Sequence, residues 1–390
     1  MIPTLSEDIR ICLGHDGLED GQDGAMAPPI VQTSLFCKAS HQELGAALAA
    51  EHEHHVYTRG QNPTVEALER KIALLERGEV CKCFASGMAA VAACLFASVR
   101  QGDHILFVNN VYGPTLQLAK RLESFGVSHD YLRTTDLETV EAALRPETRL
   151  IYFESPGTML FKVLDIAALC SLAKARNIRT VIDNTWATPL FQKPLLLGVD
   201  LVVHSATKYL SGHSDVVAGA VIGGRETMRR LFYDAYLLLG GALGPMDAWL
   251  VHRGLRTFPT RMQQHHKDGL GVAAFLRRHP KVRRVYHPWV EPADRAQSES
   301  QMSGASGLFS FELNTESFPR VALFVDHLKL FKIGVSWGGV ESLVIAPFRG
   351  DNAADLTAAG LPLGLVRLSV GLEGAGALIE DLARALDAAL

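Results

Sequence analysis

Two residues that follow apolar, strand-like runs have side chains that could perform chemistry together. Asp183 lies in the run TVIDN (180–184), and Lys208 follows the run DLVVH (200–204) within the stretch SATKYLSG. Lysine is almost never fully buried without a partner, so a lysine just past a core strand needs an explanation. A lysine amine can form an imine with an aldehyde, and a carboxylate can hold a pyridine nitrogen in its protonated form. The alternative is a surface lysine near a turn and an aspartate that caps a helix.

A second group of small residues predicts a phosphate site. The stretch FASGMAAVAACLF (84–96) places Gly87 and Met88 at the start of an alanine-rich helix, where backbone N–H groups and the helix dipole favour an anion. Ser205 and Thr207, close to Lys208, could add hydroxyl groups to the same phosphate. With Asp183 and Lys208, these residues meet the needs of pyridoxal 5′-phosphate (PLP). The S-G-x-A pattern alone is weak, because many tight helix starts share it.

The strand-like runs alternate with amphipathic segments through the middle of the chain. The runs are HILFV (104–108), RLIYF (149–153), TVIDN, DLVVH and VAGAVIG (217–223), and the segments between them include TLQLAKRLESFG and DIAALCSLAKARN. This alternation predicts an α/β fold with a mostly parallel, doubly wound sheet. Ligands of such sheets bind beyond the carboxyl ends of the strands, which is where Asp183 and Lys208 fall.

The two ends of the chain depart from this rhythm. Residues 1–60 are predicted to form an arm, residues 61–250 a cofactor-binding domain, and residues 251–390 a smaller α+β domain. In the last part, GLFSFEL is predicted as a strand and ALIEDLARALDAAL as a closing helix. The polar segment 289–307 is predicted as a long surface loop.

Composition restricts the classes of function. Hydrophobic residues make up 48% and charged residues 21% of the 390 residues, and the net charge is −4. We therefore expect a globular protein that binds no nucleic acid. The N-terminal stretch lacks the apolar core of a signal peptide and no run of eighteen apolar residues occurs, so we expect no membrane span and a cytoplasmic location.

Metal binding is not expected either. Six cysteines are scattered along the chain, and only Cys81 and Cys83 are close together, which is no zinc-binding pattern. The segment EHEHH (51–55) invites a metal interpretation, but its spacing is not that of a stiff ligand set. We interpret it as a solvated approach to the residues that follow.

Several motifs together resemble a known family. HSATKYLSGHSD, IDNTWATPLFQKPLLLGVD, VYTRGQNPTVEALERKIALLE, FESPGT, RGLRTFPTRMQQH and SWGGVESL are similar to stretches of the Cys/Met-metabolism (trans-sulfuration) family of PLP-dependent enzymes. The resemblance runs from about residue 28 to the C-terminus in the family's order. It implies the PLP fold-type I architecture, which is aspartate-aminotransferase-like, with a smaller C-terminal α+β domain.

The resemblance also implies roles for residues around the cofactor. Lys208 would carry the cofactor imine and move the proton at the substrate α-carbon, Asp183 would pair with the ring nitrogen, and Tyr112 would stack on the ring. The phosphate ligands would be Gly87, Met88, Ser205 and Thr207, joined by Tyr57 and Arg59 of the neighbouring subunit. A homodimer is then the minimum assembly, and a homotetramer the usual one.

Substrate residues are implied by three further motifs. Arg367, in GLVRLSVGLE, would hold the α-carboxylate of a sulfur amino acid, since a guanidinium binds a carboxylate bidentately. Ser336 and Trp337 of SWGG would line the same side of the pocket. Tyr236 of DAYLLLGG would lie near it.

Within the family, the motifs are most similar to bacterial cystathionine β-lyase. Trp337 stands where γ-acting members generally have leucine, and Pro114 stands where methionine γ-lyases have cysteine. The expected reaction is β-elimination of cystathionine to homocysteine, pyruvate and ammonia. Gly60 and Val335 depart from β-lyases that carry arginine and tyrosine there, which puts recognition of the distal amino acid in doubt.

Three alternatives stay open. One is a broader cysteine-S-conjugate or cystine β-lyase, and another is a γ-acting member, namely methionine γ-lyase, cystathionine γ-lyase or γ-synthase. The third is a non-catalytic binding or regulatory member of the family. The presence of Lys208, Asp183, Tyr112 and Arg367 argues against the third.

Overall fold

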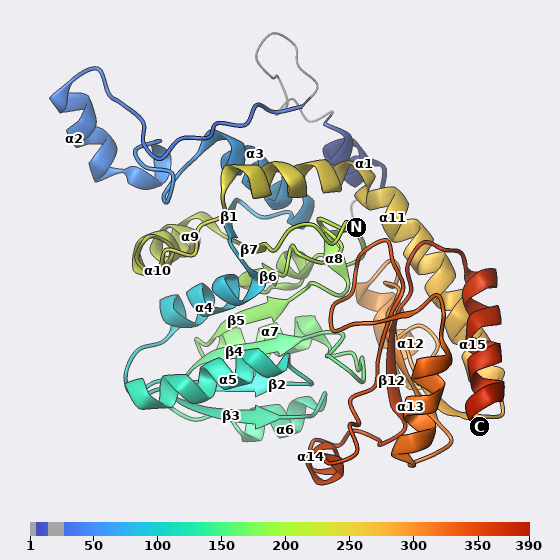
Figure 1. The fold of residues 1–390 in the computed structure, drawn as a ribbon. Coiled ribbons are helices and arrows are strands. Elements are labelled where there is room, and N and C mark those ends of the chain that lie inside the picture. Colours follow the sequence, from blue (N-terminus) through green and yellow to red (C-terminus); the bar gives the residue numbers. More distant parts are fainter. Residues whose placement is uncertain (1–4, 15–26) are drawn as a thin grey trace. The chain divides into compact units, whose positions relative to one another are not determined.

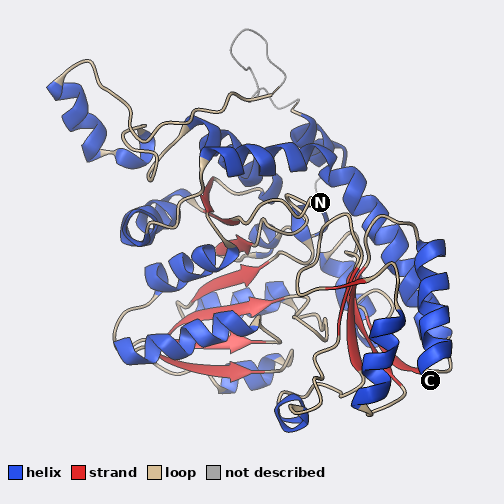
Figure 2. Cartoon of the chain, in the orientation of Figure 1, coloured by secondary structure: helices blue, strands red, loops and turns tan. Residues whose placement is uncertain are grey.

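A computed structural model describes residues 5–14 and 27–390, which fall into two compact units. Unit 1 contains the described residues up to Glu154 together with Asp165–Pro259, and unit 2 contains Ser155–Leu164 and Thr260–Leu390. The boundary falls inside helix α11 (Pro245–Arg278). Each unit combines helices with one sheet (Figure 2). The predicted three-part division at residues 60 and 250 stays a prediction.

Unit 1 is built on a seven-stranded sheet with the order β1-β7-β6-β5-β4-β2-β3 (Figure 1). Strands β2 to β6 run parallel to one another, whereas β7 is antiparallel to both β6 and β1. The predicted mostly parallel sheet is confirmed. The strands are β1 (Val80–Phe84), β2 (His104–Val108), β3 (Ser128–Leu132), β4 (Thr148–Glu154), β5 (Arg179–Asp183), β6 (Leu201–His204) and β7 (Gly219–Gly223).

Helices cover the sheet and bury its apolar side chains. One face packs against α4 (Gly87–Ser98), α5 (Gly113–Leu122) and α9 (Arg225–Leu231) through alternate strand residues such as Phe107, Tyr152 and Val203. This alternation follows from the period of two along a strand. The other elements after the arm are α3 (Pro63–Glu76), η3 (Glu123–Phe125), α6 (Leu137–Ala142), α7 (Ile166–Ala175), α8 (Thr188–Phe191), η4 (Pro194–Leu197), η5 (Phe232–Tyr236, a π-helix) and α10 (Leu237–Leu239).

Residues 27–60 bury few side chains in unit 1, whereas α1 (Leu5–Leu13) buries Asp8, Ile11 and Cys12. The first sixty residues also form α2 (His41–Ala49) and η2 (Glu51–Glu53), while residues 15–26 lie outside the described part. In α2 only Ala47 is buried, and the side chains of Leu35 and Leu48 are each 53% exposed.

Unit 2 has a five-stranded sheet with the order β10-β11-β12-β9-β8. The predicted strand GLFSFEL corresponds to β9, and the predicted closing helix to α15. The elements are β8 (Val282–Tyr286), α12 (Pro292–Gln301), β9 (Leu308–Leu313), α13 (Phe318–His327), β10 (Lys332–Ile333), β11 (Leu343–Ile345), α14 (Ala353–Ala358), β12 (Leu365–Ser369) and α15 (Ala375–Ala389).

The prediction of a surface loop over residues 289–307 was wrong for the centre of this segment, which forms helix α12. Pro292 stands at the start of this helix, where its missing N–H is not needed. Arg295 and Glu299 form a 2.8 Å ion pair one turn apart, and Ser298 is buried. The polar composition of this segment favoured a loop prediction, although the segment forms a helix that buries Ser298 and Gln301. Among the described residues, no helix has the length and hydropathy to cross a membrane.

Candidate active site

Adjacent parallel strands deliver Asp183 and Lys208 to the same edge of the sheet. Asp183 is the last residue of β5 and pairs in register with Val203 of β6. The turn after β6 then carries Lys208, whose N–H donates to the Ser205 carbonyl at 3.1 Å. The Lys208 charge is close enough to lower the pKa of the Asp183 carboxyl. The structure therefore brings together the two residues with which the sequence argument began.

The Asp183 carboxylate has one oxygen held by the protein and one left over. Its Oδ1 accepts hydrogen bonds from the Thr185 N–H at 2.9 Å and from the Thr185 hydroxyl. No residue in the described ranges donates to Oδ2, and the side chain keeps partial exposure. Burial raises the pKa of Asp183 and is the largest effect. The Thr185 hydrogen bonds and the nearby charges of His204 and Lys208 lower the same pKa. A cationic ring nitrogen at Oδ2 would remove the cost of the buried charge.

The start of α4 lies beside Ser205. Ser86 caps this helix by accepting the Ala89 N–H at 3.0 Å, so the N–H groups of Gly87 and Met88 precede the first helical hydrogen bond. A Cβ built on Gly87 would lie 2.9 Å from Ser205 Oγ, which shows how closely the two segments approach. Backbone N–H groups and a serine hydroxyl thus form a cradle suited to a phosphate.

Thr207 takes a different place from Ser205. Its hydroxyl donates to the Ala218 carbonyl at 3.1 Å and accepts the Ala218 N–H at 3.0 Å. Both interactions close the turn that carries Lys208. The hydroxyl hydrogen would have to leave Ala218 before Thr207 could donate to a phosphate.

Tyr112 stands at the start of α5 with a half-exposed ring. The side chain is 50% exposed, which leaves one face available for a cofactor ring. Its backbone N–H donates to Glu154 Oε1 at 2.6 Å, and Asn109 Nδ2 donates to the Glu154 carbonyl at 2.8 Å. Glu154 ends β4 in register with Asp183. Glu154 has no role in the sequence analysis, although a carboxylate directly after the strand-like run RLIYF (149–153) was the available signal.

Tyr57 and Arg59 lie on the exposed part of the chain that precedes α3. The guanidinium of Arg59 sits 5.3 Å from the centroid of the Tyr57 ring, and both side chains are exposed. Arg59 forms no ion pair within the part of the chain that the structure describes. An aromatic ring and an unpaired cation on the surface could together meet a phosphate from outside.

Tyr236 lies away from solvent in the core of unit 1. Only 2% of the residue is exposed, and its hydroxyl donates to the Cys83 carbonyl at 3.2 Å. The ring stacks on Phe232 and contacts the edge of Phe84. In this conformation the Tyr236 side chain has almost no surface that a substrate could contact. Its role as a substrate-binding residue stays a prediction, and the buried position does not favour it.

The predicted substrate residues of unit 2 lie together. Arg367 is on β12, and its Nη2 donates to the Val335 carbonyl at 2.9 Å. This hydrogen bond ties the guanidinium to the loop that continues into Ser336 and Trp337, both partly exposed. The Val335 side chain is 82% exposed.

Two of the three histidines of the EHEHH segment are engaged with other groups. His52 Nδ1 lies 2.9 Å from the Tyr233 hydroxyl, and His55 Nε2 lies 2.9 Å from Glu66 Oε2. Within residues 5–14 and 27–390, no three potential metal ligands come together.

The residues of unit 1 fit PLP. Asp183 has an unused carboxylate oxygen for a ring nitrogen, Lys208 supplies an amine, and Gly87 and Ser205 form an anion cradle. A mostly parallel sheet with these groups at its carboxyl edge defines a PLP-dependent enzyme of fold type I. Comparison with known families gives the particular group: residues 12–387 match "Cys/Met metabolism PLP-dependent enzyme", and the chain belongs to this family.

Curated relatives cover nearly the whole chain. It is 39% identical over 381 residues to the L-methionine gamma-lyase of Fusobacterium nucleatum subsp. polymorphum, covering 96% of each protein. It is 40% identical over 386 residues to the cystathionine beta-lyase of Lactococcus lactis subsp. cremoris, covering 96% of this chain and 97% of the relative. The cystathionine gamma-lyase of Bacillus subtilis (strain 168) is 38% identical over 380 residues, with the same coverage. The chain is thus a PLP-dependent enzyme whose relatives bear β-lyase and γ-lyase names.

Proposed function

We propose that this enzyme is a carbon–sulfur β-lyase that cleaves cystathionine, with water, into homocysteine, pyruvate and ammonia. The observation that carries the lyase chemistry is the meeting of Asp183, Lys208 and the Gly87–Ser205 cradle at one edge of the sheet. When bound there, PLP supplies an electron sink for the electron pair left at the substrate α-carbon. The protein's part is to place an acid–base group at that carbon and to hold the substrate.

Lys208 is the proposed acid–base group. A desolvated amine beside another cationic group is neutral at lower pH than a free lysine, so it can accept the α-proton near neutrality. Asp183 would hold the ring nitrogen through Oδ2, and Tyr112 would cover one ring face. Thr185 fixes the Asp183 carboxylate, and Glu154 fixes the Tyr112 backbone.

Arg367 is the proposed anchor for the substrate α-carboxylate. Its bond to the Val335 carbonyl orients the guanidinium and couples it to the loop of Ser336 and Trp337. Binding the carboxylate at a fixed point leaves the thioether sulfur to be recognised by this loop. Val335, with its exposed apolar side chain, would face the distal part of the substrate.

Trp337 and Pro114 favour β-elimination over γ-elimination. By the family resemblance, γ-acting members generally have leucine at the position of Trp337, and methionine γ-lyases have cysteine at the position of Pro114. The γ-acting alternative has a specific support of its own, since a relative named L-methionine gamma-lyase is as similar as those named cystathionine beta-lyase. A cystine or cysteine-S-conjugate β-lyase is supported by Gly60 and Val335. They replace the arginine and tyrosine that some β-lyases carry at these positions, so recognition of the distal amino acid of cystathionine would differ.

Product analysis separates these alternatives. Purified enzyme with PLP is incubated with cystathionine, cystine or methionine, and the keto acid is identified by mass spectrometry. The proposal expects pyruvate from cystathionine. Production of 2-oxobutyrate from cystathionine or methionine contradicts it and assigns a γ-lyase, whereas pyruvate from cystine alone assigns the broader β-lyase.

We also propose that the enzyme acts as a homodimer or a pair of dimers. Residues 1–60 would form an arm that brings Tyr57 and Arg59 to the phosphate of the neighbouring subunit. Residues 61–250 would bind the cofactor, and residues 251–390 would supply Arg367. The exposure of Tyr57, Arg59 and the apolar side chains of Leu35 and Leu48 supports an interface on this part of the chain.

A further inference from the structure

One buried carboxylate in unit 1 has no place in the machinery described above. Glu76 is the last residue of α3 and its side chain is 0% exposed. Its Oε1 lies 2.5 Å from His204 Nε2 and accepts a hydrogen bond from Asn184 Nδ2 at 2.8 Å. Its Oε2 is buried, and no described residue hydrogen-bonds to it. Nearby cations and hydrogen-bond donors stabilise a carboxylate buried in this way. The charge of Lys193 interacts with Glu76, and the short contact to the 1% exposed His204 has the geometry of a charge-assisted pair.

The two partners of Glu76 flank the proposed cofactor residues along the chain. Asn184 directly follows Asp183 at the end of β5, and His204 directly precedes Ser205 at the end of β6. Asn184 also donates its backbone N–H to the Val203 carbonyl at 2.9 Å and accepts a hydrogen bond from Gln192 at 2.9 Å. Glu76 therefore bridges the ends of the two strands that deliver the carboxylate and the lysine.

We propose that Glu76 and His204 are positioning residues for the cofactor. Glu76 holds the ends of β5 and β6 in place, and so fixes Asp183 relative to the turn that carries Lys208. The inference rests on the proposed role of Asp183 and is independent of which sulfur amino acid is cleaved.

The charges around Asp183 support this role. Burial raises the pKa of Asp183, and the His204 and Lys208 charges lower it. The other titratable groups that interact with Asp183 are the buried Tyr152 and Cys94, whose pKa values are raised by burial, so both are neutral.

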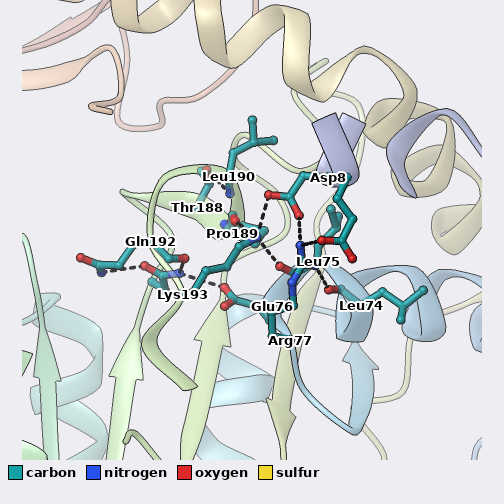
Figure 3. Close-up of polar contacts among 12 residues, drawn as sticks. Asp8, Leu74, Leu75, Glu76, Arg77, Thr188, Pro189, Leu190, Gln192 and Lys193 are labelled. Atoms are coloured by element: carbon teal, nitrogen blue, oxygen red, sulfur yellow. Dashed lines mark hydrogen bonds and ion pairs between the residues drawn. The ribbon is translucent and has the colours of Figure 1, made fainter. Parts of the chain in front are cut away.

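A second layer of polar contacts holds the residues on either side of Glu76 in the chain (Figure 3). Asp8 of α1 accepts hydrogen bonds from Arg77 at 2.9 Å and from Lys193 at 3.0 Å. Arg77 follows Glu76 as the cap of α3, and Lys193 also donates to the carbonyls of Leu75 and Pro189. Asp8 thus anchors the last turn of α3 without contacting His204 or Asn184. It provides a matched control that loosens the structure but leaves the Glu76–His204 pair in place.

The test uses Glu76→Gln and His204→Gln, which keep side-chain size and remove the charge. We measure the dissociation constant of PLP from each apoenzyme and the visible absorption of the lysine-bound cofactor as a function of pH. A hydrogen bond to a charged group that is lost or misplaced at the ring nitrogen changes an equilibrium constant about tenfold, so we expect each variant to bind PLP about tenfold more weakly. The absorption profile should shift along the pH axis. The double variant should lose no more than either single variant, since the two residues act as one unit.

Asp8→Asn should lower the thermal unfolding midpoint while PLP affinity and the absorption profile stay within twofold of the wild type, which is roughly fivefold less than the expected effect. The inference is overturned if Glu76→Gln and His204→Gln retain wild-type affinity and absorption, or if Asp8→Asn shows the same loss. If His204→Gln does not fold, Glu76→Gln alone decides. Asp183→Asn separates the two proposals: unchanged PLP binding in that variant contradicts the proposed site itself.

Discussion

The backbone N–H of Tyr112 donates to Glu154 Oε1 at 2.6 Å, which joins the start of α5 to the carboxyl end of β4. Glu154 is 8% exposed and stands in register with Asp183, so one carboxylate places the proposed ring-stacking tyrosine relative to the proposed partner of the ring nitrogen. Glu154 acts through Tyr112 and has no assigned contact with the substrate. It is therefore a positioning residue.

Replacing Glu154 by alanine leaves the Tyr112 N–H without its acceptor. We expect a stability loss of about 1–3 kcal/mol, typical of a buried polar group left unsatisfied. We also expect kcat to fall more than KM rises, because the ring loses its fixed position. Urea unfolding and steady-state kinetics measure the two effects, and Glu154→Gln, which keeps an acceptor oxygen, should recover most of both. Equal defects in the alanine and glutamine variants would contradict this role.

Replacing Lys208 by alanine tests the centre of the site. Without the amine, neither covalent attachment of the cofactor nor proton transfer at the α-carbon is available, so turnover should be abolished. The visible absorption of the lysine-bound cofactor should disappear as well. Lys174→Ala, which removes an exposed lysine from α7, serves as the control and should retain both properties. An unchanged spectrum in Lys208→Ala rules out Lys208 as the cofactor lysine.

Local sequence patterns were sufficient to predict the elements that carry Asp183 and Lys208. Each residue follows a short run of β-branched and other apolar residues, and the edge of a parallel sheet brings such strand ends together. β1 and β3 were not predicted, because Lys82 interrupts the first and Ser128–Leu132 is polar and only half buried. These strands are stabilised by their neighbours in the sheet rather than by a pattern of their own.

The residues that hold the site were harder to predict than the site itself. Glu76 is 128 positions from its partner His204, and Glu154 is 42 positions from Tyr112. No local spacing encodes such pairs. Tyr236 shows the converse difficulty: a motif predicts a pocket residue, and the structure places its ring in the core, stacked on Phe232. Residue type and motif indicate which chemistry a site can perform, whereas packing decides which side chains lie in the site.

Acid should destabilise unit 2 through His265. This residue of α11 is 0% exposed, its Nδ1 lies 2.9 Å from the Val370 carbonyl, and burial lowers its pKa to about 4. The unfolded chain, with a histidine pKa near 6.5, binds the proton more readily, so stability is complete above that pH and is lost as the pH falls towards 4. The contribution is about 3 kcal/mol. His287, with a pKa lowered to about 3, acts in the same direction.

Urea unfolding over this pH range measures the effect. His265→Gln should make the stability curve flatter by up to about 1.4 kcal/mol per pH unit, the value for one proton. His327→Gln, at a histidine on the surface of α13, is the control and should leave the slope unchanged. A wild-type slope in His265→Gln would assign the acid sensitivity to other groups.

The proposed arm predicts complementation between two inactive variants. Arg59→Ala removes the cation that would reach the neighbouring phosphate, and Lys208→Ala removes the amine of a subunit's own site. In a mixed dimer, the subunit that keeps Lys208 receives the intact arm of its partner, so one of the two sites is complete. Random mixing after dissociation should then restore about a quarter of the wild-type activity, since half of the dimers are mixed and each has one working site. Activity is measured before and after mixing, with each variant mixed with itself as the control. If Arg59 acts on the cofactor of its own subunit, no mixture contains a complete site and activity stays at the level of the two variants alone.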